Sequence, residues 1–245
     1  MSVFNEEHRL PSAIESILKQ SYQSWLLILI NDGSTDNSQK VINHYVEEDK
    51  RITCIVNKSN KGLAYSLNKA IESCNSEFIA RMDADDVALQ NRLEAQLDFL
   101  KDHSEVDVLG TGAEVIYATN HKSTILKPKN HNSISRSIEK INPFFHSSVI
   151  MRRSFIESMG GYDVKCLRAQ DYDLWLRGID RFMYHNLQEV LMIYSSRNQS
   201  FLSIYYGLRV RVVNAYRRDR LIVGTSKAIM VFVYGIWVKT VRSFK

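Results

Sequence analysis

Helical and extended patterns of apolar residues alternate along the first half of the chain. Apolar positions three and four residues apart give residues 6–20 one hydrophobic helix face. The unbroken or alternating apolar pattern of a strand occurs at 26–30, 52–56, 77–82 and 106–116. Helical spacing recurs between these runs at 37–48, 62–74 and 89–100. Strands that alternate with helices predict an α/β fold, with a mostly parallel sheet flanked by helices.

The second half has a less regular pattern. Residues 117–137 are polar, residues 144–151 are apolar, and residues 170–178 have helical spacing after a Gly160-Gly161 turn. Long loops in this half are expected to form a binding cleft.

The composition is that of a folded protein, with 44% hydrophobic and 24% charged residues. The three cysteines, Cys54, Cys74 and Cys166, are widely spaced and form no CxxC pair. Neither a disulfide scaffold nor a thiolate metal site is indicated, and a reducing compartment is expected. The first residues are acidic where a signal peptide would be basic, so nothing in them indicates export.

Basic charge is concentrated at the C-terminal end. Residues 201–245 hold nine Lys and Arg and one acid, Asp219, for a net charge of +8, whereas residues 1–200 hold 23 basic and 26 acidic residues, or −3. We therefore expect one domain over residues 1–200 and a basic, partly apolar helical tail over residues 201–245. Basicity confined to a tail argues against a nucleic-acid-binding protein and favours an anionic membrane surface as partner.

The apolar part of the tail is interrupted. Lys227 divides residues 221–238, and the charge-free remainder, residues 228–238, is too short to cross a bilayer as a helix. With Trp237 and flanking basic residues the segment is typical of an interfacial anchor, while a helix packed on the domain is the alternative.

Acidic residues follow the apolar run at residues 77–82. Ligands of an open parallel sheet bind at the carboxyl ends of its strands, so Asp83, Asp85 and Asp86 are placed to face a ligand. Two carboxylates at this spacing can hold Mg²⁺ or Mn²⁺, whose remaining ligands are commonly phosphates and water. The pattern thus suggests a diphosphate ligand. The alternative is a solvated acidic turn that caps the helix at residues 89–100.

Asp32 ends another strand and belongs at the same edge. Its carboxylate can accept hydrogen bonds from a base or a ribose, although a plain strand-to-helix turn is equally compatible with the pattern. A GxGxxG turn between a strand and a helix is absent, which disfavours a dinucleotide-binding enzyme, and the lack of GxxxxGK[ST] excludes a P-loop NTPase.

A further carboxylate opens the helix at residues 170–178. Asp171 lies in its first turn, where it can act as a general base facing the cleft or simply favour the positive helix end. Leu174 and Trp175 are expected to face the core. His146, in an apolar run, has either a structural or a chemical role.

Six motifs occur in the order and at the spacings of family 2 glycosyltransferases, and the chain resembles a bacterial member of that family. They lie at residues 4–7, 31–36, 60–64, 80–86, 160–163 and 170–175. The resemblance runs from residue 2 to about residue 200. It implies a GT-A fold, with a mixed, mostly parallel sheet, a nucleotide-diphosphate sugar in the amino half and the acceptor in the carboxyl half.

The resemblance assigns donor-binding roles to five residues. Phe4 stands where the family usually has a Tyr against the nucleobase, with Glu6 close by. Asp32 matches the carboxylate that contacts the base. Asp83 and Asp85 match the pair that bridges the ribose and the metal-bound diphosphate, which implies Mn²⁺ or Mg²⁺ as cofactor.

On the acceptor side, Asp171 matches the catalytic base of an inverting transfer, and His146 and Trp175 are expected near the acceptor. The implied acceptor is a hydroxyl of a glycan or a polyprenyl-linked sugar in cell-surface polysaccharide synthesis. We therefore expect a cytoplasmic enzyme that is peripheral on the inner face of the cell membrane.

Three departures from the family pattern affect these expectations. The chain begins almost at its first motif, so the first strand is expected to be truncated, through an upstream start or at a cost in stability. Arg197 lies where relatives often carry a metal-binding His, and it is a candidate for the phosphates instead. Gln170 replaces an acid that commonly precedes the base, which would let Asp171 ionise more easily.

Two other functions are weighed against the enzyme. A sugar-phosphate nucleotidyltransferase also uses acidic sites, but it requires a glycine-rich amino-terminal phosphate loop that the chain lacks. A degenerate glycosyltransferase that binds a sugar nucleotide or serves as a scaffold is favoured by the short first strand and the missing His.

Overall fold

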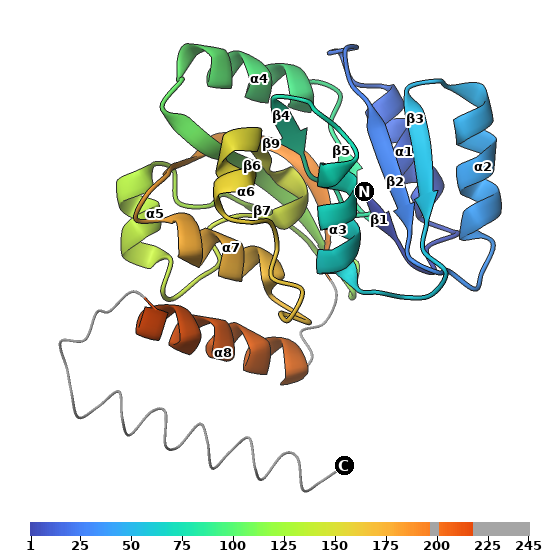
Figure 1. Cartoon of the computed structure of the whole chain (residues 1–245). Coiled ribbons are helices and arrows are strands. Elements are labelled where there is room, and N and C mark those ends of the chain that lie inside the picture. Colours follow the sequence, from blue (N-terminus) through green and yellow to red (C-terminus); the bar gives the residue numbers. More distant parts are fainter. Residues whose placement is uncertain (197–200, 218–245) are drawn as a thin grey trace, which may run out of the picture.

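The computed structural model describes residues 1–196 and 201–217, which form an α/β fold built on two sheets (Figure 1). The first sheet is parallel, with its strands in the order β1-β2-β3. The bounds of its strands and of the helices between them are β1 (Ser2–Val3), α1 (Leu10–Leu18), β2 (Leu27–Asn31), α2 (Ser38–Glu48), β3 (Ile52–Val56) and α3 (Leu63–Glu72).

The second sheet is mixed and contains six strands in the order β4-β8-β6-β9-β5, with β7 paired to β6. Its long parallel pair, β6 and β9, is bordered by antiparallel pairs. The strands are β4 (Phe78–Ala80), β5 (Val87–Ala88), β6 (Val106–Tyr117), β7 (Lys122–Ile125), β8 (Ile150–Arg152) and β9 (Met183–Ser196). The helices are α4 (Arg92–Asp102), α5 (His131–Ser137), the 3₁₀ turn η1 (His146–Ser148), α6 (Arg153–Ser158), α7 (Gln170–Gly178) and α8 (Phe201–Arg217). The expected α/β architecture with a mixed sheet is confirmed.

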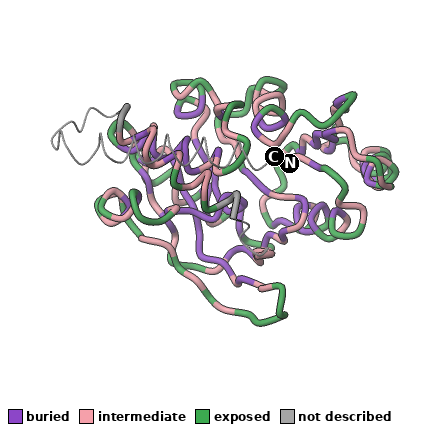
Figure 2. The backbone as a smooth tube through the Cα atoms, turned by 90° about the horizontal axis from the view of Figure 1, so that it is seen from below, coloured by how far each residue is buried: buried purple, intermediate pink, exposed green. Residues whose placement is uncertain are grey.

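Apolar spacing accounts for the buried helix faces. In α1, Leu10, Ile14 and Ile17 face the first sheet and are buried, and Pro11 stands in the first turn, where its missing N–H costs nothing. Figure 2 shows buried segments through the middle of the molecule and exposed turns at its edges. The helices are thus held to the sheets by their apolar stripes, as the sequence predicts.

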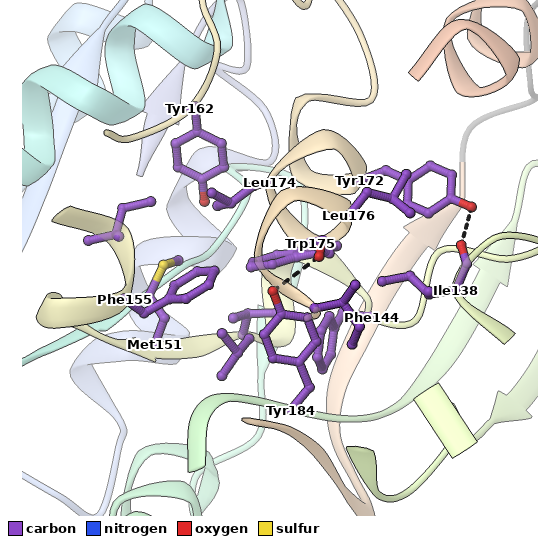
Figure 3. Close-up of a cluster of buried hydrophobic side chains, with 14 of the residues drawn as sticks. Ile138, Phe144, Met151, Phe155, Tyr162, Tyr172, Leu174, Trp175, Leu176 and Tyr184 are labelled. Carbon is purple, nitrogen blue, oxygen red and sulfur yellow. Dashed lines mark hydrogen bonds between the residues drawn. The ribbon is translucent and has the colours of Figure 1, made fainter. Parts of the chain in front are cut away.

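A large core lies around Trp175 of α7 (Figure 3). Trp175 is 0% exposed and packs edge-to-face on Phe144, with ring centroids 5.2 Å apart. The Tyr184 hydroxyl of β9 donates to the Trp175 carbonyl oxygen at 3.1 Å. This core fixes α7 against the second sheet and so sets the position of its first turn.

The first part of the expected tail packs on the domain. Residues 201–217 form α8, which lies against α7 and buries Val210 in the Trp175 core (Figure 1). Asn214 Nδ2 donates to Asp173 Oδ1 at 2.9 Å. Residues 218–245, with the expected interfacial anchor, lie outside the described residues. Within residues 1–196 and 201–217, no helix is long and apolar enough to span a membrane.

Candidate active site

Asp32 directly follows β2 and orders the loop that leads into α3. Its carboxylate accepts hydrogen bonds from Asn57 Nδ2 at 2.8 Å and from the backbone N–H groups of Lys61 and Gly62, each at 2.9 Å. Only 2% of the residue is exposed. Asp32 therefore stands at the expected edge of the sheet with its carboxylate engaged by the protein, and its contact with a nucleobase stays a prediction.

The loops after β1 and β2 are joined side by side. Gly33 has a φ of 74°, and a Cβ there would come 2.6 Å from the carbonyl carbon of Ser59, so only glycine fits. The Thr35 N–H donates to Asn5 Oδ1 at 2.8 Å. Phe4 lies on this joined surface and is 43% exposed. An exposed aromatic ring beside a carboxylate-bearing loop suits the stacking role expected for Phe4.

Arg9 links the loop after β1 to the acidic turn after β4. Its Nη1 lies 3.3 Å from Asp85 Oδ2, and its Nε lies 4.0 Å from Glu6 Oε2. Glu6 is held in turn by its backbone N–H, which donates to Ser38 Oγ at 2.9 Å. Glu6 and Asp85 thus face the same guanidinium, so the two predicted donor-binding segments are neighbours.

The acidic turn brings three carboxylates together. One oxygen from each of Asp83, Asp85 and Asp86 lies within 4.8 Å of the others. The side chains of Asp83 and Asp85 are 30% and 13% exposed, so both are accessible to a ligand. Three clustered carboxylate oxygens are the donor set that suits a hard divalent cation.

A buried arginine supports this turn from behind. The Arg81 side chain is 3% exposed, donates to Asp83 from Nη2, and donates to Ser147 Oγ from Nη1 at 3.1 Å. The Ser147 hydroxyl donates to the second Asp83 oxygen at 3.0 Å. Burial would raise the pKa of Asp83, but the Arg81 charge outweighs that effect and lowers it to about 2. Asp83 is therefore held ionised and in one orientation.

Asp86 anchors the turn to β9. The Ser195 N–H donates to Asp86 Oδ1 at 2.7 Å, and the Ser195 hydroxyl donates to the Asp85 carbonyl oxygen at 2.7 Å. Burial raises the pKa of Asp86 to about 7, and the nearby Asp83 charge acts in the same direction. Asp86 Oδ2 is buried and has no hydrogen-bond partner within the described part of the chain. A buried oxygen left without a donor fits a site built for a cation.

Asp171 lies in the first turn of α7 and is bonded to the loop that precedes η1. The Asn142 side-chain amide donates to Asp171 Oδ2 at 2.6 Å. The charges of Asp171 and Asp83 both act on the pKa of His146, Tyr162 and Tyr194. Asn142, which bonds Asp171, and Ser147, which bonds Asp83, lie five residues apart in the chain. One short segment therefore contacts both the base candidate and the acidic turn.

His146 is a buried residue of η1, next to Ser147. It is 8% exposed, and its Nε2 is 2.9 Å from the Tyr162 hydroxyl. Burial, followed by the Arg81 charge, lowers the pKa of His146 to about 4, so the ring is neutral near pH 7. Trp175 requires a correction, because a side chain that is 0% exposed in the core cannot contact an acceptor in this conformation.

The sequence reasoning missed several residues that complete the site. Arg81, Ser147, Asn142 and Ser195 each bond a predicted site residue or its backbone. The only available signal was a charged residue, Arg81, in an otherwise apolar strand pattern. Arg197, the candidate for phosphate contact, lies outside the described residues.

Comparisons with known proteins give consistent results. The sequence profile of Glycosyl transferase family 2 matches residues 1–160. EpsE of Bacillus subtilis (strain 168) is 35% identical over 238 residues, which cover 95% of this chain and 79% of EpsE. The O-antigen biosynthesis glycosyltransferase WbnJ of Escherichia coli is 33% identical over 206 residues, which cover 82% of this chain and 79% of WbnJ.

Solved structures give the fold. S. aureus TarS 1-349 in complex with UDP superposes with a TM-score of 0.70 at 18% identity, over 87% of this chain and 63% of that chain. The mannosyltransferase PcManGT from Pyrobaculum calidifontis, in complex with GDP-Man and Mn²⁺, superposes with a TM-score of 0.68 at 15% identity, over 88% and 62%. This chain therefore spans slightly less than two thirds of each structure. The likeness shows that it has the GT-A fold of these glycosyltransferases.

Proposed function

We propose that this chain, which belongs to glycosyl transferase family 2, is an inverting, metal-dependent glycosyltransferase of cell-surface polysaccharide synthesis. Its donor is a nucleotide-diphosphate sugar, and its acceptor is a hydroxyl of a glycan or a polyprenyl-linked sugar. The observation that carries this proposal is the cluster of Asp83, Asp85 and Asp86, one carboxylate oxygen of each lying within 4.8 Å of the others.

The donor diphosphate is proposed to bind at the acidic turn. Asp83 and Asp85 would hold Mg²⁺ or Mn²⁺, with a carboxylate oxygen of Asp86 as a further ligand. When bound, the cation neutralises charge on the diphosphate and so makes the nucleoside diphosphate a better leaving group. The Mn²⁺ bound with GDP-Man in PcManGT, a neighbour in fold, supports this assignment.

The nucleoside is proposed to lie over the joined loops that follow β1 and β2. The exposed Phe4 ring would stack on the base, with Glu6 beside it, and Asp32 would accept a hydrogen bond from the base. Since Asp32 already bonds the backbone at Lys61 and Gly62, base binding is coupled to the order of that loop. UDP bound to TarS supports a nucleotide donor for this chain but does not identify the base of that nucleotide.

Asp171 is proposed as the general base. Its carboxylate takes the proton from the acceptor hydroxyl as that oxygen forms a bond to the anomeric carbon, and the bond from that carbon to the diphosphate oxygen breaks on the opposite face. Asn142 fixes the orientation of the carboxylate. His146, which is neutral, is proposed to act near the acceptor through its contact with Tyr162. Asp171 and the cation-bound leaving group thus act on opposite sides of the transferred sugar.

The site of action is proposed to be the cytoplasmic face of the membrane. A lipid-linked acceptor and the net charge of +8 on residues 201–245 both suit an anionic surface. The basic residues from 218 onward lie outside the described part of the chain, so this step rests on composition alone.

Calorimetric titration of the full chain with UDP and with GDP, with and without Mn²⁺, tests donor binding. We expect affinity for one nucleotide to rise at least about tenfold with Mn²⁺. Absence of any metal-linked binding would remove the metal-dependent proposal.

Transfer is then scored by mass change in a screen of sugar nucleotides on a lipid-linked acceptor pool. We expect Asp171→Asn to abolish transfer with nucleotide affinity kept within several-fold, whereas Asp98→Asn, a control on an exposed acid, leaves both unchanged. Full turnover by Asp171→Asn would place the base elsewhere. Metal-linked binding with no transfer from any donor would indicate a binding or scaffold protein instead.

A further inference from the structure

Helix α8 reaches the two residues that directly follow the proposed base. Asp171 lies in the first turn of α7, ahead of Tyr172 and Asp173, which are 3% and 2% exposed. Arg211 Nε of α8 donates to the Tyr172 hydroxyl at 3.1 Å. About one turn further along α8, Asn214 holds Asp173. The start of α7 is therefore tied to a helix that comes from a distant part of the chain.

Arg211 also joins α7 to the segment that follows α5. Its Nη2 donates to the Lys140 carbonyl oxygen at 2.7 Å. The Tyr172 hydroxyl, which accepts from Arg211, donates in turn to the Ile138 carbonyl oxygen (Figure 3). A guanidinium is planar and rigid, so its two donors fix the directions of both acceptors at once. Arg211 thereby sets the place of residues 138–140 relative to the first turn of α7.

Residues 138–140 lead directly to the partner of the proposed base. Asn142 follows this segment closely in the chain, and its side-chain amide donates to Asp171 Oδ2 at 2.6 Å. The backbone carbonyl oxygen of Asn142 accepts a hydrogen bond from Lys127 Nζ at 3.1 Å. Arg211 therefore bridges the two segments beside the point where Asn142 meets Asp171, although no hydrogen bond joins it to either residue within the described part of the chain.

The first turn of α7 depends on contacts from outside because its own start is weak. Ala169, the residue before the helix, has a φ of 58°, in the left-handed region that alanine disfavours. Its side chain cannot cap the free N–H groups of the first turn. A helix start with a strained backbone and no cap needs tertiary contacts to hold one conformation. Arg211 and Asn214 supply two of them.

From these contacts we propose that Arg211 is a positioning residue for the transfer reaction. It keeps Asp171 and Asn142 in fixed relative places, so that the carboxylate points at the acceptor hydroxyl when the proton is taken. This inference rests on the proposed role of Asp171 as general base. A purely structural role is the alternative. In that case α8 would stabilise the domain through Val210 and Asn214, and the loss of Arg211 would leave the turnover of folded protein unchanged.

Steady-state kinetics of Arg211→Met in the full chain test the proposal. We expect kcat to fall at least about fivefold, with KM for the sugar nucleotide and Mn²⁺-linked nucleotide affinity within about twofold, because only the base is displaced. Tyr172→Phe keeps the ring in the core but removes the hydroxyl, and it should lower kcat in the same way. Arg209→Met is the matched control on the same helix, since Arg209 lies over the Tyr206 ring at 5.9 Å, and it should keep wild-type kinetics. Wild-type kcat in Arg211→Met, or an equal fall in Arg209→Met, would overturn the proposal.

A double variant separates positioning from a general loss of stability. In the Asn142→Ala background the orientation of the base is already lost, so Arg211→Met should lower kcat by less than a further factor of about two. Effects of the two substitutions that multiply in the double variant would show that Arg211 acts by another route, and the proposal would then be wrong.

Hydrogen exchange tests the same link without turnover. We expect Arg211→Met to speed amide exchange at least about fivefold in residues 138–142 and 170–173 and to leave β6 unchanged. Unchanged exchange in both segments would refute positioning by Arg211. Loss of turnover in Asp171→Asn together with wild-type kcat in Arg211→Met would overturn this inference alone. Full turnover by Asp171→Asn would remove the proposed base and, with it, the catalytic consequence of Arg211.

Discussion

Arg81 and Asp83 form an ion pair that is buried at one end and open at the other. The guanidinium side chain is 3% exposed, whereas the carboxylate side chain is 30% exposed. Arg81 therefore pairs with Asp83 from the interior side, while part of the Asp83 carboxylate remains open to solvent. This arrangement keeps a carboxylate ionised, with its pKa lowered to about 2 by Arg81 against the effect of burial.

Replacing Arg81 by Met should destabilise the fold. Asp83 and Ser147 would lose the cation that they share, and breaking a buried pair from one side typically costs about 3–5 kcal/mol. Because Asp83 is partly exposed, we expect the lower end of that range in urea unfolding at pH 7. Arg9→Met is the matched control, since Arg9 pairs with Asp85 from a side chain that is 53% exposed, and it should cost less than about 1 kcal/mol. Equal losses in the two variants would contradict this account.

His146 should make the protein acid-sensitive. Its folded pKa of about 4 is below the ordinary value of 6.5, so protonation disfavours the folded state. The contribution is fully present above pH 6.5 and is lost as the pH falls toward 4, by about 3 kcal/mol in total. Urea unfolding at several pH values should show a shallower decline for His146→Gln than for the wild type. His8→Gln, on a side chain that is 91% exposed, should keep the wild-type profile. A His146→Gln profile parallel to the wild type would mean that the ring is not buried as neutral imidazole.

Asn142 should act on catalysis through Asp171. Asn142→Ala removes the donor at 2.6 Å from the carboxylate and leaves the proposed donor site intact. We expect kcat to fall about tenfold or more while KM for the sugar nucleotide changes less than about twofold, because only the orientation of the base is lost. Asn142→Asp, which cannot donate to the carboxylate and adds a like charge beside it, should lower kcat at least as much as Asn142→Ala. Unchanged kcat in both variants would remove the positioning role.

Helix α8 should stabilise the domain through Asn214. Its amide donates to Asp173, which is 2% exposed, so Asn214→Ala takes a hydrogen bond from a buried carboxylate. We expect a loss of about 1–3 kcal/mol in unfolding free energy. Leu208→Ala on the same helix is the control, because Leu208 is 52% exposed and should cost less than about 0.5 kcal/mol. Similar effects of the two substitutions would indicate that α8 is held by something other than this contact.

The period of apolar residues in the sequence correctly predicted those helices and strands that bury one face along their length. The run at residues 26–30 became β2, and the spacing at residues 89–100 became α4 (Arg92–Asp102), with both ends within a few residues. The two-residue strand β5 and the antiparallel strand β8 were not predicted, since two or three residues carry no measurable period. Their pairing is decided by tertiary contacts, which also make the sheet more antiparallel than the pattern indicates.

The site residues that directly follow a strand could be predicted from the sequence. The residues that reach the site from distant parts of the chain could not. Asp83 and Asp85 could be placed because they follow an apolar run, and the turn does bring their oxygens together. Asn142 and Asp171 are 29 residues apart, and Ser195 is 110 residues from Asp85, so no local spacing could pair them. Trp175 was assigned both to the core and to the acceptor, and the structure places it in the core.

Arg9 has a consequence for how ligands bind together. It faces both Glu6, which we propose lies beside the nucleobase, and Asp85, which we propose holds the cation, and more than half of its side chain is accessible to solvent. A cation bound at Asp85 would compete with the Arg9 guanidinium for that carboxylate. It would thereby weaken the contact that holds residues 5–9 next to the acidic turn. By reciprocity, a nucleoside that reorders the loop alters cation affinity to the same degree. We therefore expect the nucleoside and the cation-bound diphosphate of the donor to bind cooperatively.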